Sequence, residues 1–194
     1  MNNVKSILLV GVGGQGILLS SEVLSEILIR MNYDIKKNEI HGMAQRGGTV
    51  TSQIRYGEKV YSPKIPDRGC EMIVSLEYME SARFLNLLAP GGIILSSSQK
   101  IIPSVVSSGQ GKYPENIEDY YKKNHINCSF IPAHQFAEEL GNMKVINIIM
   151  MGYLNQKLQF PVEVWETVLK EKVKPKFIDL NLKAFHKGFT YKGE

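Results

Sequence analysis

The stretch ILLVGVGGQGILLSSEVLSEILIRM, residues 7–31, decides the fold class of this chain. Its first four residues are apolar and are followed by Gly11, a pattern typical of a short strand buried on both faces of a parallel sheet. From Gly16 to Met31, apolar residues recur at helical spacing without an interrupting Pro or Gly. A strand, a glycine-rich turn and a helix, with a second strand predicted at 34–40, indicate the first half of a doubly wound α/β unit.

The rest of the chain continues this alternation of strands and helices. Runs of apolar and β-branched residues predict further strands, at 49–56, 70–76, 93–96 and 128–132. Helical patterns follow, at 77–88, 115–123, 135–140, 145–154, 162–172 and 176–188. Gly57 and Glu58 have the composition of a β-hairpin turn leading into a strand at 59–62. We therefore predict one domain, residues 1–194: an α/β fold with a single doubly wound, mostly parallel, Rossmann-like sheet, flanking helices and this hairpin.

Composition excludes several classes of function. The chain of 194 residues has a formal charge of +4, and its Lys residues are scattered, which argues against nucleic acid as a partner. No apolar run reaches the roughly 18 residues of a membrane span, and the N-terminal apolar run is too short for a secretory signal, so we expect a cytoplasmic protein away from membranes. The two cysteines, Cys70 and Cys128, lack metal-type spacing, so we expect no metal site and name no catalytic residue.

The first candidate site is the glycine loop, Gly11, Gly13, Gly14, Gln15 and Gly16. It follows a predicted strand and opens a helix, which is the setting in which such a loop binds a phosphate. Glycines let the anion approach the backbone, and the helix N-terminus supplies free N–H groups and partial positive charge. The structural alternative is tight strand-to-helix packing with no ligand, and the sequence leaves both open.

A dinucleotide is one possible ligand of this loop. It requires an acidic residue at the end of the second strand, about 20 residues after the loop. Glu39 has suitable spacing, whereas Asp34 falls at the start of that strand. No catalytic His–acid pair is evident downstream, so a stand-alone NAD oxidoreductase or a ligand-sensing protein remains the alternative function.

The second candidate site is the polar loop that follows the strand at 34–40. Arg46, beside Gly47 and Gly48, has the chemistry to clamp a carboxylate or phosphate with two hydrogen bonds, although a salt bridge within the fold or at a subunit interface is an equal alternative. His41 is a weaker candidate for a general base, because no acidic partner is evident, and we favour a loop histidine that makes one hydrogen bond to the backbone. Glu77 follows the strand predicted at 70–76, and we expect it to cap the first turn of the next helix. The alternative is that its side chain reaches the crevice at the carboxyl edge of the sheet, where the two loops are expected.

Four segments carry a resemblance to a known family. They are GVGGQGI at 11–17, HGMAQRGG at 41–48, VYSPKI at 60–65 and SLEYMESAR at 75–83. In this order and spacing they resemble the gamma-type domain of 2-oxoacid:ferredoxin oxidoreductases, and the HGMAQRGG form is similar to the indolepyruvate branch, where the domain is the small (beta) subunit. The resemblance is firm to about Ser97 and loose beyond it, and the segment 96–127 matches no family pattern.

The resemblance implies an enzyme subunit that is inactive alone. The whole enzyme would convert an aryl 2-oxoacid, coenzyme A and oxidised ferredoxin to an acyl-CoA, carbon dioxide and reduced ferredoxin. A large alpha subunit would carry thiamine diphosphate, Mg and the 4Fe-4S clusters and would meet ferredoxin. This chain has no Cys cluster and no Gly-Asp-Gly run, which agrees with that division. This chain would hold no cofactor firmly, but its glycine loop and Arg46 would contact coenzyme A. Alternatively, these loops would have a purely structural role in contact with the partner subunit. A homodimer of this chain is also compatible with the resemblance.

Overall fold

The fold is built on one six-stranded sheet. The computed structural model describes residues 4–42 and 48–193. Its strands are β1 (Lys5–Val12), β2 (Asp34–His41), β3 (Thr49–Gly57), β4 (Cys70–Ser75), β5 (Leu88–Ser97) and β6 (Asn127–Ile131), in the spatial order β2-β3-β1-β4-β5-β6. Each strand predicted from hydrophobic patterning is present except the one at 59–62.

The sheet is mixed rather than wholly parallel. β1, β4, β5 and β6 are parallel neighbours, with Ile7 opposite Met72 and Ile93 opposite Asn127. β3 runs antiparallel to both of its neighbours, β1 and β2. The prediction of a mostly parallel α/β sheet is therefore confirmed, but β3 separates β2 from β1, which a simple Rossmann-like unit would place side by side.

The hairpin predicted at Gly57–Glu58 is wrong. β3 pairs instead with the strand before it, β2, from Asp34 opposite Gly57 to His41 opposite Val50. Residues 58–69 form no strand, because side chains rather than a ladder satisfy their backbone. Asp34 accepts from the Val60 amide at 2.9 Å, and Gln53 accepts from the Ile65 amide at 2.7 Å.

Alternating residues of β1 belong to two hydrophobic cores on opposite faces of the sheet. Ile7 and Leu9 belong to the larger core, under the main helical layer, while Leu8 and Val10 belong to the smaller core on the other face. All four side chains are at most 1% exposed. Burial on both faces explains why this strand reads as a continuous apolar run in the sequence.

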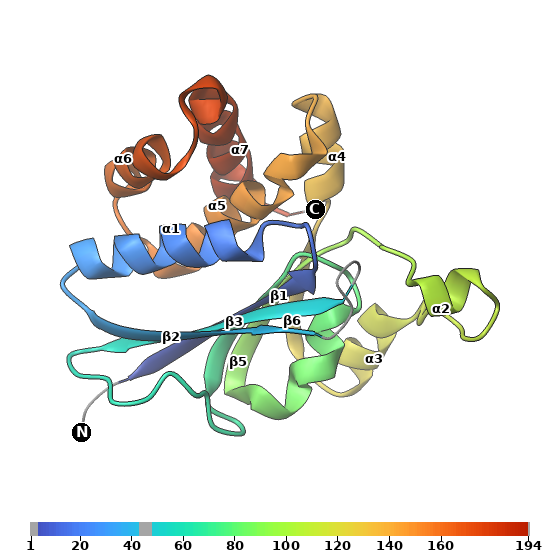
Figure 1. Cartoon of the computed structure of the whole chain (residues 1–194). Helices are drawn as coiled ribbons and strands as arrows, with labels where there is room; N and C mark the ends of the chain where they lie inside the picture. Colours follow the sequence, from blue (N-terminus) through green and yellow to red (C-terminus); the bar gives the residue numbers. More distant parts are fainter. Residues whose placement is uncertain (1–3, 43–47, 194) are drawn as a thin grey trace.

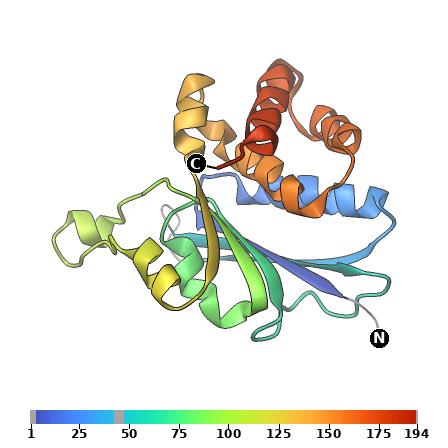
Figure 2. The same ribbon diagram turned by 180° about the vertical axis from the view of Figure 1, so that it is seen from behind.

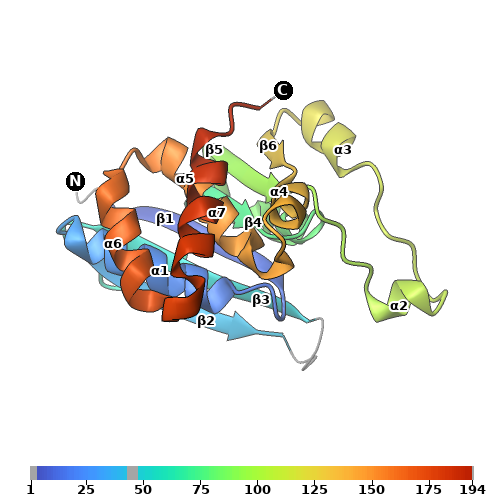
Figure 3. The same cartoon turned by 90° about the horizontal axis from the view of Figure 1, so that it is seen from above.

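The two faces of the sheet carry unequal layers (Figures 1 and 2). One face is covered by five helices, α1 (Ile17–Arg30), α4 (Ala133–Glu139), α5 (Ile146–Leu158), α6 (Val162–Lys172) and α7 (Ile178–Thr190), with short turns η2 (Met143–Val145) and η3 (Pro175–Phe177). The other face carries η1 (Glu80–Leu87) and α3 (Ile117–Lys123), while α2 (Ser104–Ser107) stands away from the sheet, as the view from above shows (Figure 3). Within the described part of the chain, no helix is long and apolar enough to cross a membrane.

α5 is the centre of the thicker layer. Every residue from Ile146 to Asn155 is buried, including Met150 and Met151, so the predicted Met-rich helix is part of the core. Gly152 of α5 and Gly188 of α7 meet at the crossing of these helices, where an added Cβ on either would overlap the backbone of the other helix. The absence of side chains at these two positions therefore sets the close approach of α5 and α7.

Two other segments differ from the sequence prediction. The helix predicted at 77–88 is a 3₁₀ segment, η1, interrupted at Phe84, whose backbone leaves helical geometry (φ −120°, ψ 20°). The strand predicted at 93–96 begins earlier, at Leu88, and its first half contains Gly91 at φ +76°, where the pairing with β4 shifts register between Cys70 and Met72. A bulge therefore interrupts the first half of β5.

Candidate functional site

The two predicted loops meet at the carboxyl edge of the parallel strands. The glycine loop leaves β1 after Val12 and enters α1 at Ile17. Gly48 precedes β3, and its carbonyl oxygen accepts a hydrogen bond from the Gly13 amide at 2.9 Å. Gly48 therefore lies against the glycine loop at the edge where ligands bind in α/β proteins.

Two of the loop's glycines are required by packing. Gly11 is buried in β1, and a Cβ there would lie 2.8 Å from Oε1 of Gln15 and 3.2 Å from Leu76. Gly16 has φ +86°, and a Cβ there would lie 2.6 Å from Nδ2 of Asn147. The Asn147 amide donates to the Gly16 carbonyl at 3.2 Å, which ties the start of α1 to α5.

The tip of the loop has the properties of an anion site. Gly13 and Gly14 are exposed, and Gly14 adopts φ +98°; within residues 4–42 and 48–193, no atom beyond its chain neighbours lies within 4 Å of the position that a Cβ would take. α1 starts without a side-chain cap at Gly16 and without an acidic residue in its first turn. Since an α-helix leaves its first N–H groups without intrahelical acceptors, this end offers donors and partial positive charge to an anion.

Gln15 uses its side chain to join three strands. Its Oε1 accepts from the Val12 amide at 2.8 Å, while Nε2 donates to the Leu76 carbonyl at 2.8 Å and to Oε1 of Gln99 at 2.9 Å. These partners lie at or just beyond the ends of β1, β4 and β5. The Gln15 side chain therefore fixes the shape of the loop, and any contact of this residue with a ligand would come through its backbone.

Arg46 and Gly47 of the second loop lie outside the described residues, as does the rest of 43–47. His41 is the last residue of β2, and its backbone pairs with Val50. Gly48 is the one predicted binding residue of this loop that the structure describes, and its carbonyl faces the glycine loop through the bond to Gly13.

The geometry argues against a dinucleotide site. Glu39, the predicted ribose-binding acid, accepts from Nζ of Lys37 at 2.9 Å and from the Ser21 hydroxyl at 3.2 Å. It lies on β2, which β3 separates from β1 and its glycine loop. In a dinucleotide-binding fold the acid ends the strand adjacent to the loop strand, so this chain lacks that arrangement.

Glu77 caps η1, as the sequence indicates, and also makes two bonds that the sequence did not reveal. The side chain is buried, with the residue 1% exposed. Its Oε2 accepts from the Met79 and Glu80 amides at 2.7 and 3.1 Å. Its Oε1 accepts from the Ile101 amide at 3.0 Å and from the Tyr113 hydroxyl at 2.5 Å. Burial and the Glu77 carboxylate raise the pKa of Tyr113, which keeps the phenol protonated as a donor.

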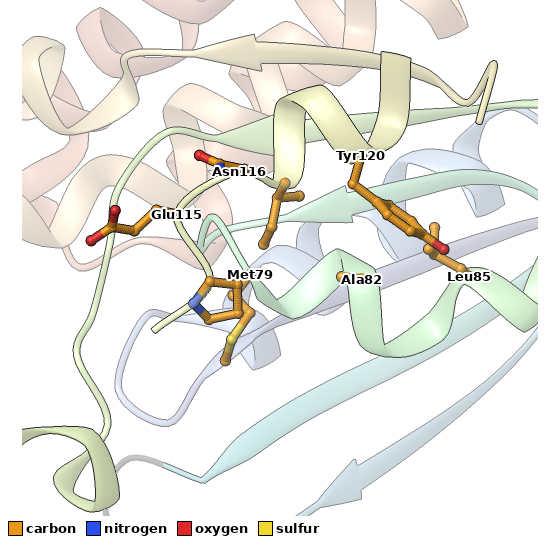
Figure 4. A pocket seen from close by; sticks show the side chains of 8 residues that line it. Met79, Ala82, Leu85, Glu115, Asn116 and Tyr120 are labelled. Carbon is orange, nitrogen blue, oxygen red and sulfur yellow. The ribbon is translucent and has the colours of Figure 1, made fainter. Parts of the chain in front are cut away.

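Two cavities among the described residues lie away from the glycine loop. A cavity of about 460 Å³ opens between η1 and α3 (Figure 4), lined by Met79, Ala82, Leu85, Pro114, Glu115, Asn116, Ile117 and Tyr120. A smaller polar cavity of about 270 Å³ adjoins it and shares Glu115 and Asn116. Neither is lined by a residue of the glycine loop.

Residue types that bind metals are dispersed among the residues that the structure places. No group of three His, Cys, Asp or Glu side chains is arranged to hold a metal ion in residues 4–42 and 48–193. Cys70 and Cys128 are free thiols, and burial raises the pKa of each to about 12. Both are therefore protonated near neutral pH and poor nucleophiles.

Comparison with known proteins places the chain in a family. Residues 6–191 match the family model described as pyruvate ferredoxin/flavodoxin oxidoreductase. The chain is 35% identical over 189 residues to indolepyruvate oxidoreductase subunit IorB of Thermococcus kodakarensis, which covers 94% of this chain and 93% of that protein. It is equally similar, 35% over 189 residues, to the subunit of the same name from Archaeoglobus fulgidus, covering 95% and 94% of the two chains.

Solved structures share the fold at low sequence identity. The gamma subunit of a keto/oxoacid ferredoxin oxidoreductase from Geobacter sulfurreducens has a TM-score of 0.70 at 21% identity, covering 95% of this chain and 96% of that one. The 2-oxoglutarate:ferredoxin oxidoreductase of Magnetococcus marinus, solved with 2-oxoglutarate, coenzyme A and succinyl-CoA bound, has a TM-score of 0.75 at 18% identity and covers 97% of this chain but 31% of that one. The family match over nearly the whole length, the 35% identities and the shared fold agree, and the chain belongs to the pyruvate ferredoxin/flavodoxin oxidoreductase family.

Proposed function

We propose that this chain is the small subunit of an indolepyruvate:ferredoxin oxidoreductase, which oxidises an aryl 2-oxoacid to an acyl-CoA. The observation that carries this proposal is the 35% identity to indolepyruvate oxidoreductase subunits over 94% of the chain. In the reaction the bond between the oxo carbon and the carboxylate breaks, and carbon dioxide leaves. The sulfur of coenzyme A bonds to the oxo carbon, its thiol proton is released, and an electron pair passes to ferredoxin.

The cofactors of this reaction belong to the proposed large alpha subunit. Thiamine diphosphate with Mg supplies the decarboxylation chemistry there, and 4Fe-4S clusters carry the electrons to ferredoxin. Each such cluster takes four thiolates, whereas this sequence has two cysteines, both buried or half-buried as neutral thiols. A cytoplasmic location is part of the proposal, since coenzyme A and ferredoxin act in that compartment.

The small subunit contributes to coenzyme A binding through its carboxyl edge. The exposed tip at Gly13 and Gly14, beside the uncapped start of α1, suits a phosphate or pyrophosphate group. Arg46, which follows β2 in the sequence, supplies a cation for the same group. Support also comes from the Magnetococcus marinus enzyme, which shares this fold and was solved with coenzyme A bound.

The assembly is tested by isolating the tagged chain from its own cells under anaerobic conditions. The proposal predicts a brown complex with a large partner, in which reduction of a viologen dye requires both an aryl pyruvate and coenzyme A. A colourless chain without a partner would contradict the subunit assignment, and a titration with dinucleotides would then address the remaining alternative.

The role of Arg46 is tested in the assembled complex. Arg46→Ala is expected to raise the KM for coenzyme A about tenfold with the complex intact, because one charge-assisted contact is worth about 1.5–3 kcal/mol. Lys5→Ala removes an exposed cation at the start of β1, the opposite edge of the sheet, and serves as the matched control. A dissociated complex with an unchanged KM would assign Arg46 to the subunit interface instead.

A further inference from the structure

Glu77 is a buried carboxylate whose bonds join parts of the chain far apart in sequence. Its Oε2 holds the start of η1, while Oε1 holds Ile101 and Tyr113, which are 24 and 36 residues away. A buried ionised group is costly unless hydrogen bonds satisfy it, and here four donors converge on two oxygens. Capping η1 accounts for the bonds at Oε2 and leaves those at Oε1 without a role.

The bonds at Oε1 hold both ends of a long connection between β5 and α3. Figures 1 and 3 show this segment, residues 98–116, projecting from the sheet with α2 at its far end. Connections longer than about 12–15 residues are uncommon in compact domains, and most have a function. Ile101 lies on the outgoing limb and Tyr113 on the returning limb, so Glu77 fixes both limbs where they leave the body.

The outgoing limb is bonded directly to the glycine loop through Gln99. The backbone carbonyl of Gln99 accepts from the backbone amide of Tyr78 at 2.8 Å, and the backbone amide of Gln99 donates to the Ser97 hydroxyl at 3.2 Å. Its side-chain Oε1 accepts from Gln15 at 2.9 Å. Gln15 in turn accepts from the Val12 amide at the base of the loop. Glu77 is therefore linked to the glycine loop by its hydrogen bond to Ile101, by the backbone from Ile101 to Gln99, and by the hydrogen bonds of Gln99 and Gln15.

We propose that Glu77 is a positioning residue for coenzyme A binding, which it supports by holding Gln99 and, through Gln15, the glycine loop in place. The inference rests on the proposed role of that loop. Glu77 does not touch the coenzyme. It fixes Ile101, two residues after Gln99, and so keeps the Gln99 side chain within reach of Gln15. Residues that act along one path lose the same function when either is changed, so their effects are not additive.

The test measures steady-state kinetics of the assembled complex carrying Glu77→Gln, Gln99→Ala or both. A Gln at 77 brings an NH₂ group towards backbone donors and breaks the clamp at Oε1 or Oε2, while Gln99→Ala leaves the Glu77 bonds untouched. Each single variant is expected to raise the KM for coenzyme A about tenfold, with kcat and the KM for the oxoacid unchanged. The double variant is expected to resemble the singles. Unchanged KM values, or additive effects in the double variant, would overturn the inference.

Two further variants separate positioning from general stability. Glu115→Gln changes an exposed carboxyl on the returning limb, and it should leave every constant unchanged, because the Tyr78 hydroxyl donates to the backbone carbonyl of Glu115. Tyr113→Phe removes the hydroxyl bond on that limb but not the path through Gln99, so the KM for coenzyme A should change less than twofold. If the KM of Tyr113→Phe for coenzyme A is as high as that of Gln99→Ala, the effect does not depend on the path through Gln99, and the inference is contradicted. If Glu77→Gln fails to assemble, Gln99→Ala still tests the path, and an unchanged KM for coenzyme A in that variant overturns the inference.

The outcome also distinguishes this inference from the proposed function. Gly14→Asp introduces a carboxylate at the loop tip and should raise the KM for coenzyme A if the loop binds the coenzyme. A raised KM in Gly14→Asp, with normal values in Glu77→Gln and Gln99→Ala, would remove only the positioning role. Normal values in all of these variants would remove the loop's role in coenzyme A binding as well.

Discussion

Glycine serves opposite purposes at the crossing of α5 and α7 and at the tip of the glycine loop. At the crossing, Gly152 and Gly188 are buried against backbone, and a side chain on either would overlap the other helix. At the tip, Gly14 is exposed with a φ of +98°, and among the described residues no atom beyond its chain neighbours lies within 4 Å of the position that a Cβ would take. The first pair is explained by packing alone, whereas an exposed glycine at positive φ beside a helix N-terminus leaves the backbone accessible to an anion.

The largest expected effect is at the crossing. Gly152→Ala places a Cβ against the Phe185 carbonyl and 2.8 Å from the Phe189 amide, so the helices must separate. We expect a loss of about 3 kcal/mol in the free energy of unfolding, measured by urea denaturation of the chain. Gly111→Ala is the matched control, since its nearest neighbour would be 3.8 Å away, and its stability should be unchanged or slightly higher. Equal stabilities of the two variants would show that the crossing tolerates a side chain.

A smaller effect on stability is expected at the loop tip, together with a specific effect on binding. Gly14→Asp and Gly14→Asn both place a side chain at positive φ, which costs about 1–2 kcal/mol and is tolerated best by these two residues. Only the carboxylate repels a phosphate at the start of α1. The KM of the assembled complex for coenzyme A should therefore rise about tenfold more in Gly14→Asp than in Gly14→Asn, while the two variants unfold at similar urea concentrations. Identical KM values would mean that no anion approaches this tip.

The thiol of Cys70 is fully buried, unlike the exposed glycine loop, and its ionisation makes the free energy of unfolding depend on pH. Burial raises the pKa of Cys70 to about 12, against about 8.5–9 for an exposed thiol. The neutral form is favoured in the folded chain, so its contribution to stability is complete below about pH 9 and is lost as the pH rises towards 12. Between pH 9 and 11 the free energy of unfolding should fall less steeply in Cys70→Ala than in the unaltered chain, by up to about 1.4 kcal/mol per pH unit. The same slope in both would show that the thiol ionises freely in the fold.

The sequence was a good guide wherever local periodicity decides structure. β1, α1 and α5 follow from apolar runs and helical spacing, because their burial is set by the pattern itself. The direction of β3 was missed, although a signal existed: the connection 42–48 is too short for a crossover between parallel strands and long enough for an antiparallel return. The pairing of β3 with the strand after it, predicted from Gly57 and Glu58, failed because β2 already occupied that edge.

The candidate site was predicted in part. Its place after β1 followed from the strand–glycine–helix order, and Glu77 was correctly expected to cap a helix. The sequence did not separate the packing glycines, Gly11 and Gly16, from the open one, Gly14, because that difference depends on neighbours 60 or more residues away, such as Leu76 and Asn147. The bonds from Glu77 to Ile101 and Tyr113 were missed for the same reason, since no local pattern encodes contacts over such separations.

The central claim is that the exposed glycine loop, unlike the glycine crossing, receives a phosphate of coenzyme A. Hydrogen exchange of the intact complex, measured by mass spectrometry with and without coenzyme A, tests it most directly. The account predicts slower exchange on coenzyme addition in peptides covering residues 13–19, which contain the loop tip and the first turn of α1, and no change in peptides from α5. Protection confined to the large partner, with residues 13–19 unaffected, would contradict it.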